Sequence, residues 1–164
     1  MKTILLGNAG AGKSTLAGQL IAHQPAARLS LDTVAFAGGS ERLPLAESVE
    51  AVRRFIAAHD SWILEGCYAD ILEPVLPFAE TLIFLNPGVE VCQQHCRARP
   101  WEPEKFGSSE EQDANLAALL AWVGTYDCRG DAYGLQSHRR LFEMFAGTKW
   151  EFTHPSQYSR ALTP

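Results

Sequence analysis

The sequence predicts an α/β fold in which helices cover both faces of a parallel sheet. Short, unbroken apolar runs recur along the chain, and the clearest is TLIFL at residues 81–85. Segments with helical periodicity separate these runs. A strand that is apolar throughout is buried on both sides, which is typical of parallel sheets with crossover helices. Ligands of such sheets bind beyond the carboxyl ends of the strands.

Five segments predict strands because β-branched, aromatic or large aliphatic residues dominate them. They are residues 2–6, 28–31, 61–64, 81–85 and 149–152. The fourth is the most sharply bounded, because Asn86, Pro87 and Gly88 follow it. The loop FAGGSERLP at residues 36–44 resists regular structure, since its glycines and proline interrupt any periodicity.

The expected helices cover residues 13–23, 46–58, 69–78, 89–97, 110–126 and 137–145. In the second, Val49, Val52 and Ile56 share one face, and charged residues cover the other. Pro74 must lie near a start or a kink of the third. Two prolines and a glycine at residues 100–109 predict a mobile loop.

Length and composition limit the class of protein. With 164 residues, 46% hydrophobic and 20% charged, the chain is expected to form one domain with a buried core. A net charge of -5 argues against nucleic acid as a partner. The apolar runs are strand-sized and no signal peptide is evident, so we expect a cytoplasmic protein without a membrane span. A monomer or a homodimer fits these numbers.

Four cysteines occur, and none forms a CxxC pair. Cys92, His95 and Cys96 fall within about one turn of an expected helix and could hold a metal. Because no second ligand pair follows at a metal-binding spacing, partly buried thiols are the preferred interpretation.

The most specific motif is GNAGAGKS at residues 7–14, which fits G-x-x-x-x-G-K-[ST] between a strand and a helix. Small residues let successive backbone N–H groups point at phosphate oxygens. Lys13 adds a point charge for the β- and γ-phosphates, and the Ser14 hydroxyl can bind Mg²⁺. The motif therefore predicts a site for ATP and Mg²⁺. Its nucleotide-binding residues are Gly7, Asn8, Ala9, Gly10, Ala11, Gly12, Lys13, Ser14 and Thr15.

Two carboxylates follow expected strands and are candidates for the same edge of the sheet. Asp32 follows the second strand and could orient an acceptor hydroxyl or take its proton. Glu65 follows the third and could hold Mg²⁺ together with Ser14, through water. The alternative for each is an exposed acid at the end of a strand.

Arginines near the mobile loop could stabilise charge on a transferring phosphoryl group and exclude water. Arg97 and Arg99 flank the start of this loop, and Arg129 ends the long helix. With Lys13 and Asp32 they complete the catalytic set that we expect. Arg139 and Arg140 are expected to be solvated helix residues.

The chain resembles small P-loop kinases of the adenylate kinase and shikimate kinase superfamily, and among them the bacterial "topology modulation protein" group. The matching stretches are ILLGNAGAGKSTLA, LSLDTVAF, SWILEGCYADIL, TLIFLNPG, CRARPWEPEKF and the residues from Tyr126 to Arg129. The resemblance implies a three-layer P-loop NTPase fold of the nucleoside monophosphate kinase type, with a five-stranded parallel sheet. It also implies a short lid at about residues 98–110, Mg-ATP as donor, and a turn at residues 153–156 against the adenine. The acceptor site that it implies is built by the segment after the second strand and by residues Glu65 to Tyr68.

The acceptor signatures of these relatives differ from this chain. Shikimate kinases carry two aspartates with one residue between them after the second strand. Ser30 and Asp32 occupy those places here, so the first acid is missing, which argues against shikimate. The segment that binds the acceptor nucleotide in adenylate kinases offers Arg42, Arg53 and Arg54, which is little support for AMP. We therefore expect an ATP-dependent kinase with an unidentified small-molecule or nucleotide acceptor. The alternative is a nucleotide-binding regulatory protein with little or no turnover.

Overall fold

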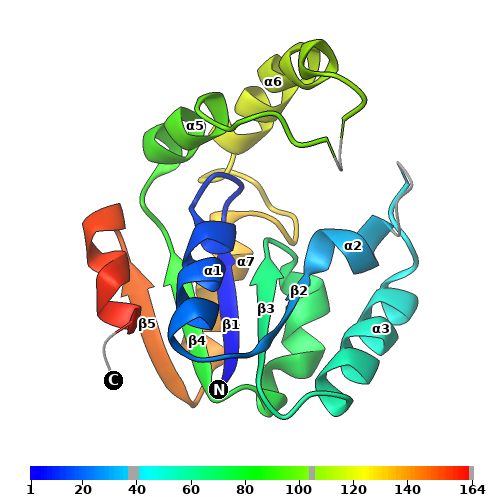
Figure 1. Ribbon diagram of the computed structural model, residues 1–164, viewed down its shortest axis with the longest axis vertical. Helices are drawn as coiled ribbons and strands as arrows, with labels where there is room; N and C mark the ends of the chain where they lie inside the picture. Colours follow the sequence, from blue (N-terminus) through cyan, green and yellow to red (C-terminus); the bar gives the residue numbers. More distant parts are fainter. Residues whose placement is uncertain (37–40, 104–105, 163–164) are drawn as a thin grey trace.

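The computed structural model describes residues 1–36, 41–103 and 106–162, and these form a three-layer α/β structure around a five-stranded sheet (Figure 1). The strands are β1 Lys2–Gly7, β2 Ala27–Ser30, β3 Trp62–Gly66, β4 Thr81–Leu85 and β5 Thr148–Phe152. Their order is β2-β3-β1-β4-β5, and all neighbouring strands are parallel. The predicted α/β class is confirmed, with an all-parallel five-stranded sheet and helices on both of its faces.

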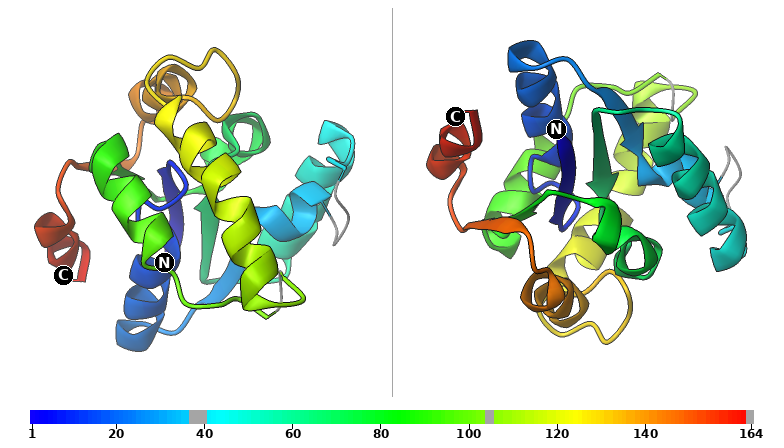
Figure 2. Two further views of the ribbon diagram at one scale, coloured as in Figure 1. Left: turned by 90° about the horizontal axis from the view of Figure 1, so that it is seen from above. Right: turned by 90° about the horizontal axis from the view of Figure 1, so that it is seen from below.

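Helices cover both faces of this sheet. They are α1 Lys13–His23, α2 Leu31–Phe36, α3 Leu45–Ala57, α4 Ala69–Leu72, α5 Val89–Arg97, α6 Ser109–Gly124 and α7 Leu135–Met144, with the 3₁₀ helices η1 Glu73–Phe78 and η2 Pro155–Leu162. Helices α1 and η2 lie on one face, and α3, α4 and α7 lie on the other (Figure 1). Helices α5 and α6 stand beyond the carboxyl ends of the strands, as the view from above in Figure 2 shows.

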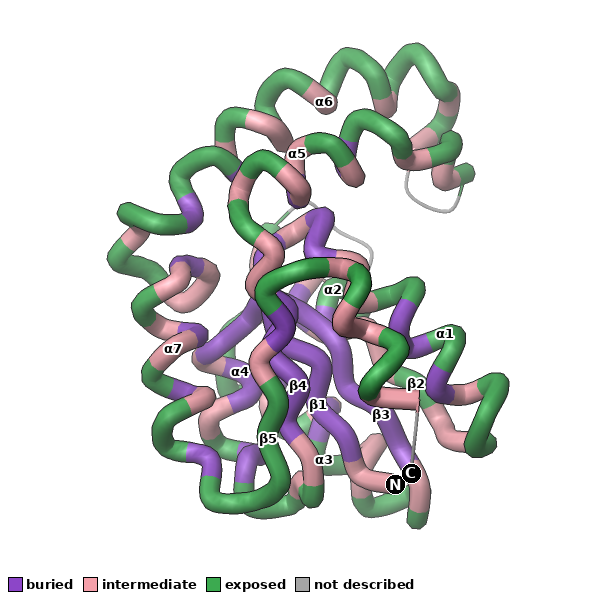
Figure 3. The backbone as a smooth tube through the Cα atoms, turned by 90° about the vertical axis from the view of Figure 1, so that its left-hand side faces the viewer, coloured by how far each residue is buried: buried purple, intermediate pink, exposed green. Residues whose placement is uncertain are grey.

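The core has two halves because side chains alternate along each central strand. Ile4 and Leu6 of β1 pack toward α3 and α7, whereas Leu5 packs toward α1. All three side chains are fully buried, so β1 is apolar on both faces, as a central parallel strand must be. Figure 3 shows the central strands as the buried interior and the helices as the exposed outer layer.

The strand order creates the place for a ligand. The chain runs from β1 to the β2 and β3 side of the sheet and then crosses to β4 on the other side of β1. A crevice forms at the carboxyl ends where the order reverses in this way. The turn between β1 and α1 and the ends of β2 and β3 all meet there (Figure 1).

Most predicted elements are present, and three of them, residues 13–23, 81–85 and 89–97, have the predicted bounds. The predicted helix at 69–78 is wrong in type after Leu72, because Pro74 and Pro77 turn it into the 3₁₀ helix η1. Helix α2 was not predicted, and Leu31 is its first residue rather than the end of a strand. The predicted loop at 36–44 and the predicted lid at 98–110 include residues 37–40 and 104–105, which lie outside the described residues.

The long helix begins one residue earlier than predicted and ends two residues earlier. The Ser108 hydroxyl accepts a hydrogen bond from the Glu111 amide at 3.1 Å, which fixes its start as an N-cap. Since the helix ends at Gly124, Arg129 lies in the segment between α6 and α7 and not at a helix end. Within the described residues, no helix is long and apolar enough to cross a membrane.

Replacing Gly10 with alanine tests how tightly the turn after β1 packs under α5. Gly10 has φ +80°, and a Cβ there would lie 2.2 Å from the Cys92 carbonyl oxygen. We expect Gly10→Ala to lower the free energy of unfolding by about 2 kcal/mol or more in urea titrations, because both backbone strain and overlap oppose it. Gly18→Ala is the control. Gly18 lies in α1 with open space around it, so this variant should gain up to about 1 kcal/mol. Equal stability of the two variants would contradict this packing.

Candidate active site

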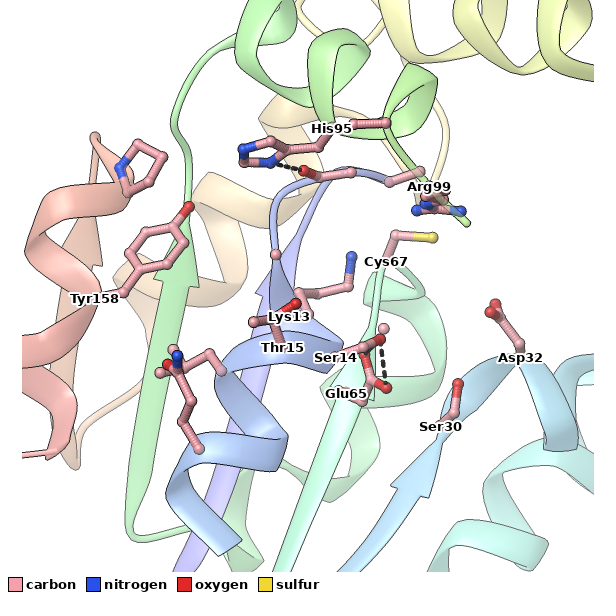
Figure 4. Close-up of a pocket in the computed structure, with 18 of the residues that line it drawn as sticks. Lys13, Ser14, Thr15, Ser30, Asp32, Glu65, Cys67, His95, Arg99 and Tyr158 are labelled. Atoms are coloured by element: carbon pink, nitrogen blue, oxygen red, sulfur yellow. Dashed lines mark hydrogen bonds between the residues drawn. The ribbon is translucent and has the colours of Figure 1, made fainter. Parts of the chain in front are cut away.

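A cavity of about 940 Å³ opens at the carboxyl edge of the sheet, beneath α5 and α6. Residues predicted for function line much of it: Ala9, Gly10, Gly12, Lys13, Ser14, Thr15, Asp32, Glu65 and Arg99. Figure 4 shows Tyr158 and Asp32 at opposite sides of this cavity, with Lys13 and Ser14 between them. Gly7, Asn8 and Ala11 do not line it, because they form the buried underside of the turn.

The turn between β1 and α1 presents main-chain N–H groups without side-chain competitors. Gly10 and Gly12 adopt left-handed conformations, with φ +80° and +93°. No side chain caps the N-terminus of α1, and no acidic residue lies in its first turn. An 11-residue helix with this kind of start attracts an anion through its orphan amides and its dipole.

Lys13 lies over the same turn. Its Nζ donates hydrogen bonds to the carbonyl oxygens of Gly7 at 3.0 Å and Asn8 at 2.8 Å. These contacts hold the ammonium group beside the amides instead of letting it extend into solvent. The turn therefore presents one fixed positive charge together with N–H dipoles.

Three side chains, one from the turn itself and two from later parts of the chain, hold the turn in place. Asn8 donates to the Val123 carbonyl at 3.2 Å, and Tyr158 donates to the Ala11 carbonyl at 2.7 Å. The ring of His95 lies 2.7 Å from the Gly10 carbonyl through Nδ1, which must carry the proton because a carbonyl only accepts. Burial raises the pKa of Tyr158, so its hydroxyl keeps the proton that it donates. The turn is thus fastened to α5, α6 and η2.

Glu65 and Ser14 form the second part of the site. Ser14 Oγ lies 3.0 and 3.1 Å from the two carboxylate oxygens of Glu65 and donates its proton there. Its oxygen lone pairs are then free to face the cavity. Glu65 belongs to β3 itself and is 3% exposed, whereas the sequence placed it after the strand. A hydroxyl oxygen and a carboxylate suit Mg²⁺ when water and phosphate supply the other ligands, so these residues fit the metal.

Asp32 and Tyr68 form the far side of the cavity. The Tyr68 hydroxyl donates to Asp32 Oδ1 at 2.5 Å. Burial and the charge of Asp32 raise the pKa of Tyr68, so the phenol remains protonated at neutral pH. Asp32 is exposed on the first turn of α2 and lines the cavity with Ser30. Its second oxygen has room to accept a hydrogen bond from a bound molecule.

The three arginines predicted to be catalytic, Arg97, Arg99 and Arg129, lie in different places relative to the main cavity. Arg99 lines the main cavity, and its guanidinium is 3.9 Å from Glu102. Arg97 lines a smaller cavity of about 420 Å³ between α5 and α6 and not the main one. Arg129 also stays outside the main cavity, because it stacks on Trp122 at 4.1 Å and pairs with Asp131 at 2.8 Å. The structure thus brings one of the three arginines to the cavity.

Arg42, like Arg129, is held by an acidic partner and by aromatic rings, one of which is that of Tyr68. It forms a salt bridge with Asp70 at 2.8 Å, and its guanidinium lies 5.5 Å from the ring centre of Tyr68 and 5.3 Å from that of Tyr133. Its cost of burial is offset by the hydrogen bond and the charge of Asp70, which keep its pKa raised. Arg42 therefore packs behind the cavity wall and does not line the cavity.

A buried histidine supports the loop after β3. His138 is fully buried, and its Nε2 donates to the Cys67 carbonyl at 2.9 Å. Its Nδ1 then accepts from the Tyr126 hydroxyl at 2.8 Å. Burial lowers the pKa of His138 to about 4, so the ring is neutral. These two bonds fix the loop that carries Cys67 and Tyr68 into the cavity.

Two residues that shape the site were not expected from the sequence: Arg28 and His138. Arg28 forms an ion pair with Glu65 that depends on the register of β2 with β3. His138 is one polar residue in an amphipathic helix, whereas Tyr68 belongs to the stretch from Glu65 to Tyr68 that the resemblance assigned to an acceptor site. Cys92 and Cys96 are buried, as preferred, and the described residues contain no cluster of three or more His, Cys, Asp and Glu side chains suited to a metal.

No protein-family model matches the chain, and no curated protein matches it in sequence. Among solved structures, the chain is similar to an unliganded sugar kinase from Janibacter sp. HTCC2649, with a TM-score of 0.52 and 13% sequence identity. The match covers 98% of this chain and 91% of that one. At this identity the likeness shows a shared, kinase-like fold.

The neutral state of His138 predicts how stability depends on pH. Its pKa in the folded protein, about 4, lies below the ordinary 6.5, so the unfolded chain binds more protons between these values. Stability is therefore full above pH 6.5 and falls as the pH drops toward 4, by on the order of 3 kcal/mol. His138→Asn should make this slope much shallower in urea titrations at pH 7, 5.5 and 4.5, and paired carboxylates such as Glu151 account for the slope that stays. His23→Asn, at the exposed end of α1, should keep the full wild-type slope. Parallel slopes in wild type and His138→Asn would show that the ring is not held neutral.

Proposed function

We propose that this protein is a phosphotransferase that moves the γ-phosphoryl group of ATP to a hydroxyl of a small molecule. The observation that carries this proposal is the joint placement of Lys13, the uncapped start of α1 and the Ser14–Glu65 pair in one cavity with Asp32. A phosphate-binding turn alone would fit any nucleotide-binding protein. The Asp32 carboxylate at the far side of the same cavity could bind an acceptor hydroxyl and take its proton.

The donor is expected to lie along the turn. Backbone amides from Gly10 to Thr15 and the Lys13 ammonium would bind its phosphates, and the base would extend toward Pro155 and Tyr158 of η2, which border the cavity. Ser14 and Glu65 would hold Mg²⁺, which neutralises charge on the β- and γ-phosphates when bound. Arg99 lines the roof of the cavity and would stabilise the charge that spreads over the transferring group.

Asp32 would bind the acceptor hydroxyl and take its proton. As the acceptor oxygen forms its bond to the γ-phosphorus, the bond from that phosphorus to the bridging oxygen breaks and ADP leaves. The proton passes to the carboxylate of Asp32, which Tyr68 orients through its 2.5 Å hydrogen bond. Little further covalent chemistry is needed, because positioning and charge stabilisation supply most of the rate.

The charges around Asp32 favour an uncharged acceptor. The nearby arginines Arg42 and Arg129 are neutralised by Asp70 and Asp131 and lie outside the cavity. Asp32 is therefore an unbalanced negative charge on this side, which repels a second phosphate group. The similar solved structure is that of a sugar kinase, and a polyhydroxyl acceptor agrees with this charge pattern. A nucleoside monophosphate would lack a cationic partner among the described residues of this wall.

Lys13→Ala tests the donor site. We expect the variant to bind Mg-ATP at least tenfold more weakly in calorimetry, and to lose ADP release by orders of magnitude, because the fixed charge over the turn is gone. Lys2→Ala, which removes a lysine at the opposite end of β1, should behave like wild type. Unchanged ATP binding in Lys13→Ala would remove the donor site from this turn.

Asp32→Asn tests the acceptor step. ADP release would be followed with Mg-ATP and matched pairs of acceptors, each an alcohol or sugar and its phosphate ester. We expect the uncharged members to be used, and Asp32→Asn to lower kcat about 10²- to 10⁴-fold with ATP affinity retained. Asp60→Asn, in an exposed turn at the far end of the sheet, is the control. Tight ATP binding with no acceptor-dependent ADP across the panel would instead support a nucleotide-binding regulator.

A further inference from the structure

Glu65 is the one acidic side chain that is buried within residues 1–36, 41–103 and 106–162. A buried carboxylate without a partner is costly, since desolvation opposes its charge. Two groups stabilise the charged carboxylate here. Ser14 Oγ donates to the carboxylate from α1, and Arg28 forms an ion pair with Oε1 from the edge strand β2.

The register of the sheet brings Arg28 to this carboxylate. In the parallel pairing of β2 with β3, Ser30 stands opposite Glu65 and Arg28 stands opposite Ile63. Residues two apart on a strand share a face, so Arg28 lies diagonally next to Glu65 on the side of α1. Its side chain is 36% exposed while that of Glu65 is 4% exposed. The guanidinium thus enters from the sheet edge and covers the carboxylate from outside.

This ion pair changes the charge that a metal would meet. A carboxylate with a full negative charge attracts Mg²⁺, but a guanidinium in contact with it cancels most of that attraction. Ser14 contributes a neutral oxygen only. Before a nucleotide binds, the pair of Ser14 and Glu65 therefore offers little net negative charge, and Lys13 adds a further positive charge to the same cavity.

We propose that Arg28 is a positioning residue that keeps the Ser14–Glu65 site neutral, so that the site takes Mg²⁺ together with a triphosphate and not as a free ion. The inference rests on the proposed function, because the bound triphosphate supplies the negative charge that attracts Mg²⁺. Arg28 offsets the charge of the Glu65 carboxylate, so that carboxylate alone does not attract the ion. Arg28 also fixes the orientation of the carboxylate, with one oxygen toward the guanidinium and both within reach of Ser14. A magnesium ion that arrives with its phosphates already partly coordinated needs only the oriented oxygens.

Titration of the nucleotide-free full chain with Mn²⁺, followed by electron paramagnetic resonance, tests this assignment. Wild type should show no saturable binding below about 1 mM, a value at the weak end for oxygen-ligand sites. Arg28→Met should bind Mn²⁺ roughly ten- to a hundredfold more tightly, since a positive charge next to the carboxylate is removed. Arg28→Lys should resemble wild type. Arg53→Met, which removes an exposed arginine from α3, is the matched control.

A double variant tests whether the tighter Mn²⁺ binding expected in Arg28→Met depends on the charge of Glu65. In Arg28→Met/Glu65→Gln the tighter binding should disappear, because the carboxylate has lost its charge. This double variant also removes the buried unpaired acid, so its fold is retained if Arg28→Met is unstable. If Arg28→Met does not fold, Arg28→Gln takes its place, since an amide can still donate to Glu65.

The outcomes separate the two proposals. Wild-type affinity for Mn²⁺ in folded Arg28→Met or Arg28→Gln would overturn the role of Arg28. Tight Mn²⁺ binding by the nucleotide-free wild type would overturn it as well. Failure of wild type to bind Mg-ATP in calorimetry would instead contradict the proposed function. Tighter Mn²⁺ binding in the single variant, lost in the double variant, supports the assignment.

Discussion

The three hydrogen bonds that fasten the turn between β1 and α1 are the constraint on which the site depends. Asn8, Gly10 and Ala11 are each joined to an element that follows at least 85 residues later: α6, α5 and η2. A glycine-rich turn has little conformational preference of its own, so its amides point in one direction only because other parts of the fold hold it. The direction of these amides is therefore set by contacts with α5, α6 and η2, and not by the eight residues of the motif alone.

The same logic explains the division of charge in the cavity. Positive groups that face the cavity gather at the turn and its roof, where Lys13 and Arg99 lie. On the side of Asp32, Arg42 and Arg129 are paired with acids and lie outside the cavity, so this side presents the Asp32 carboxylate and the phenol bonded to it. One end of the cavity thus suits a polyanion and the other suits a hydrogen-bond donor, which is the asymmetry that transfer from ATP to an alcohol requires.

The sequence predicted what local patterns determine. The glycine-rich turn has a motif, and residues 13–23, 81–85 and 89–97 have clear boundaries, so these three elements were predicted with the right bounds. Helix α2 was missed because LDTVAF is short and rich in residues that favour strands, and burial of Leu31 and Ala35 stabilises it instead. The direction in which Arg97 points depends on its position around helix α5, and that of Arg129 depends on stacking over Trp122. The contact of Arg28 with Glu65 depends on the register of β2 with β3. None of these is encoded in neighbouring residues.

The central claim is that backbone amides at the start of α1 bind the phosphates of a nucleoside triphosphate. The most direct measurement is the set of amide shifts in ¹H–¹⁵N spectra as a non-hydrolysable Mg-ATP analogue is added. We expect the largest shifts at Gly10, Gly12, Lys13, Ser14 and Thr15, saturating together at one affinity. Saturable binding that leaves these amides unmoved and shifts a different region would contradict the account.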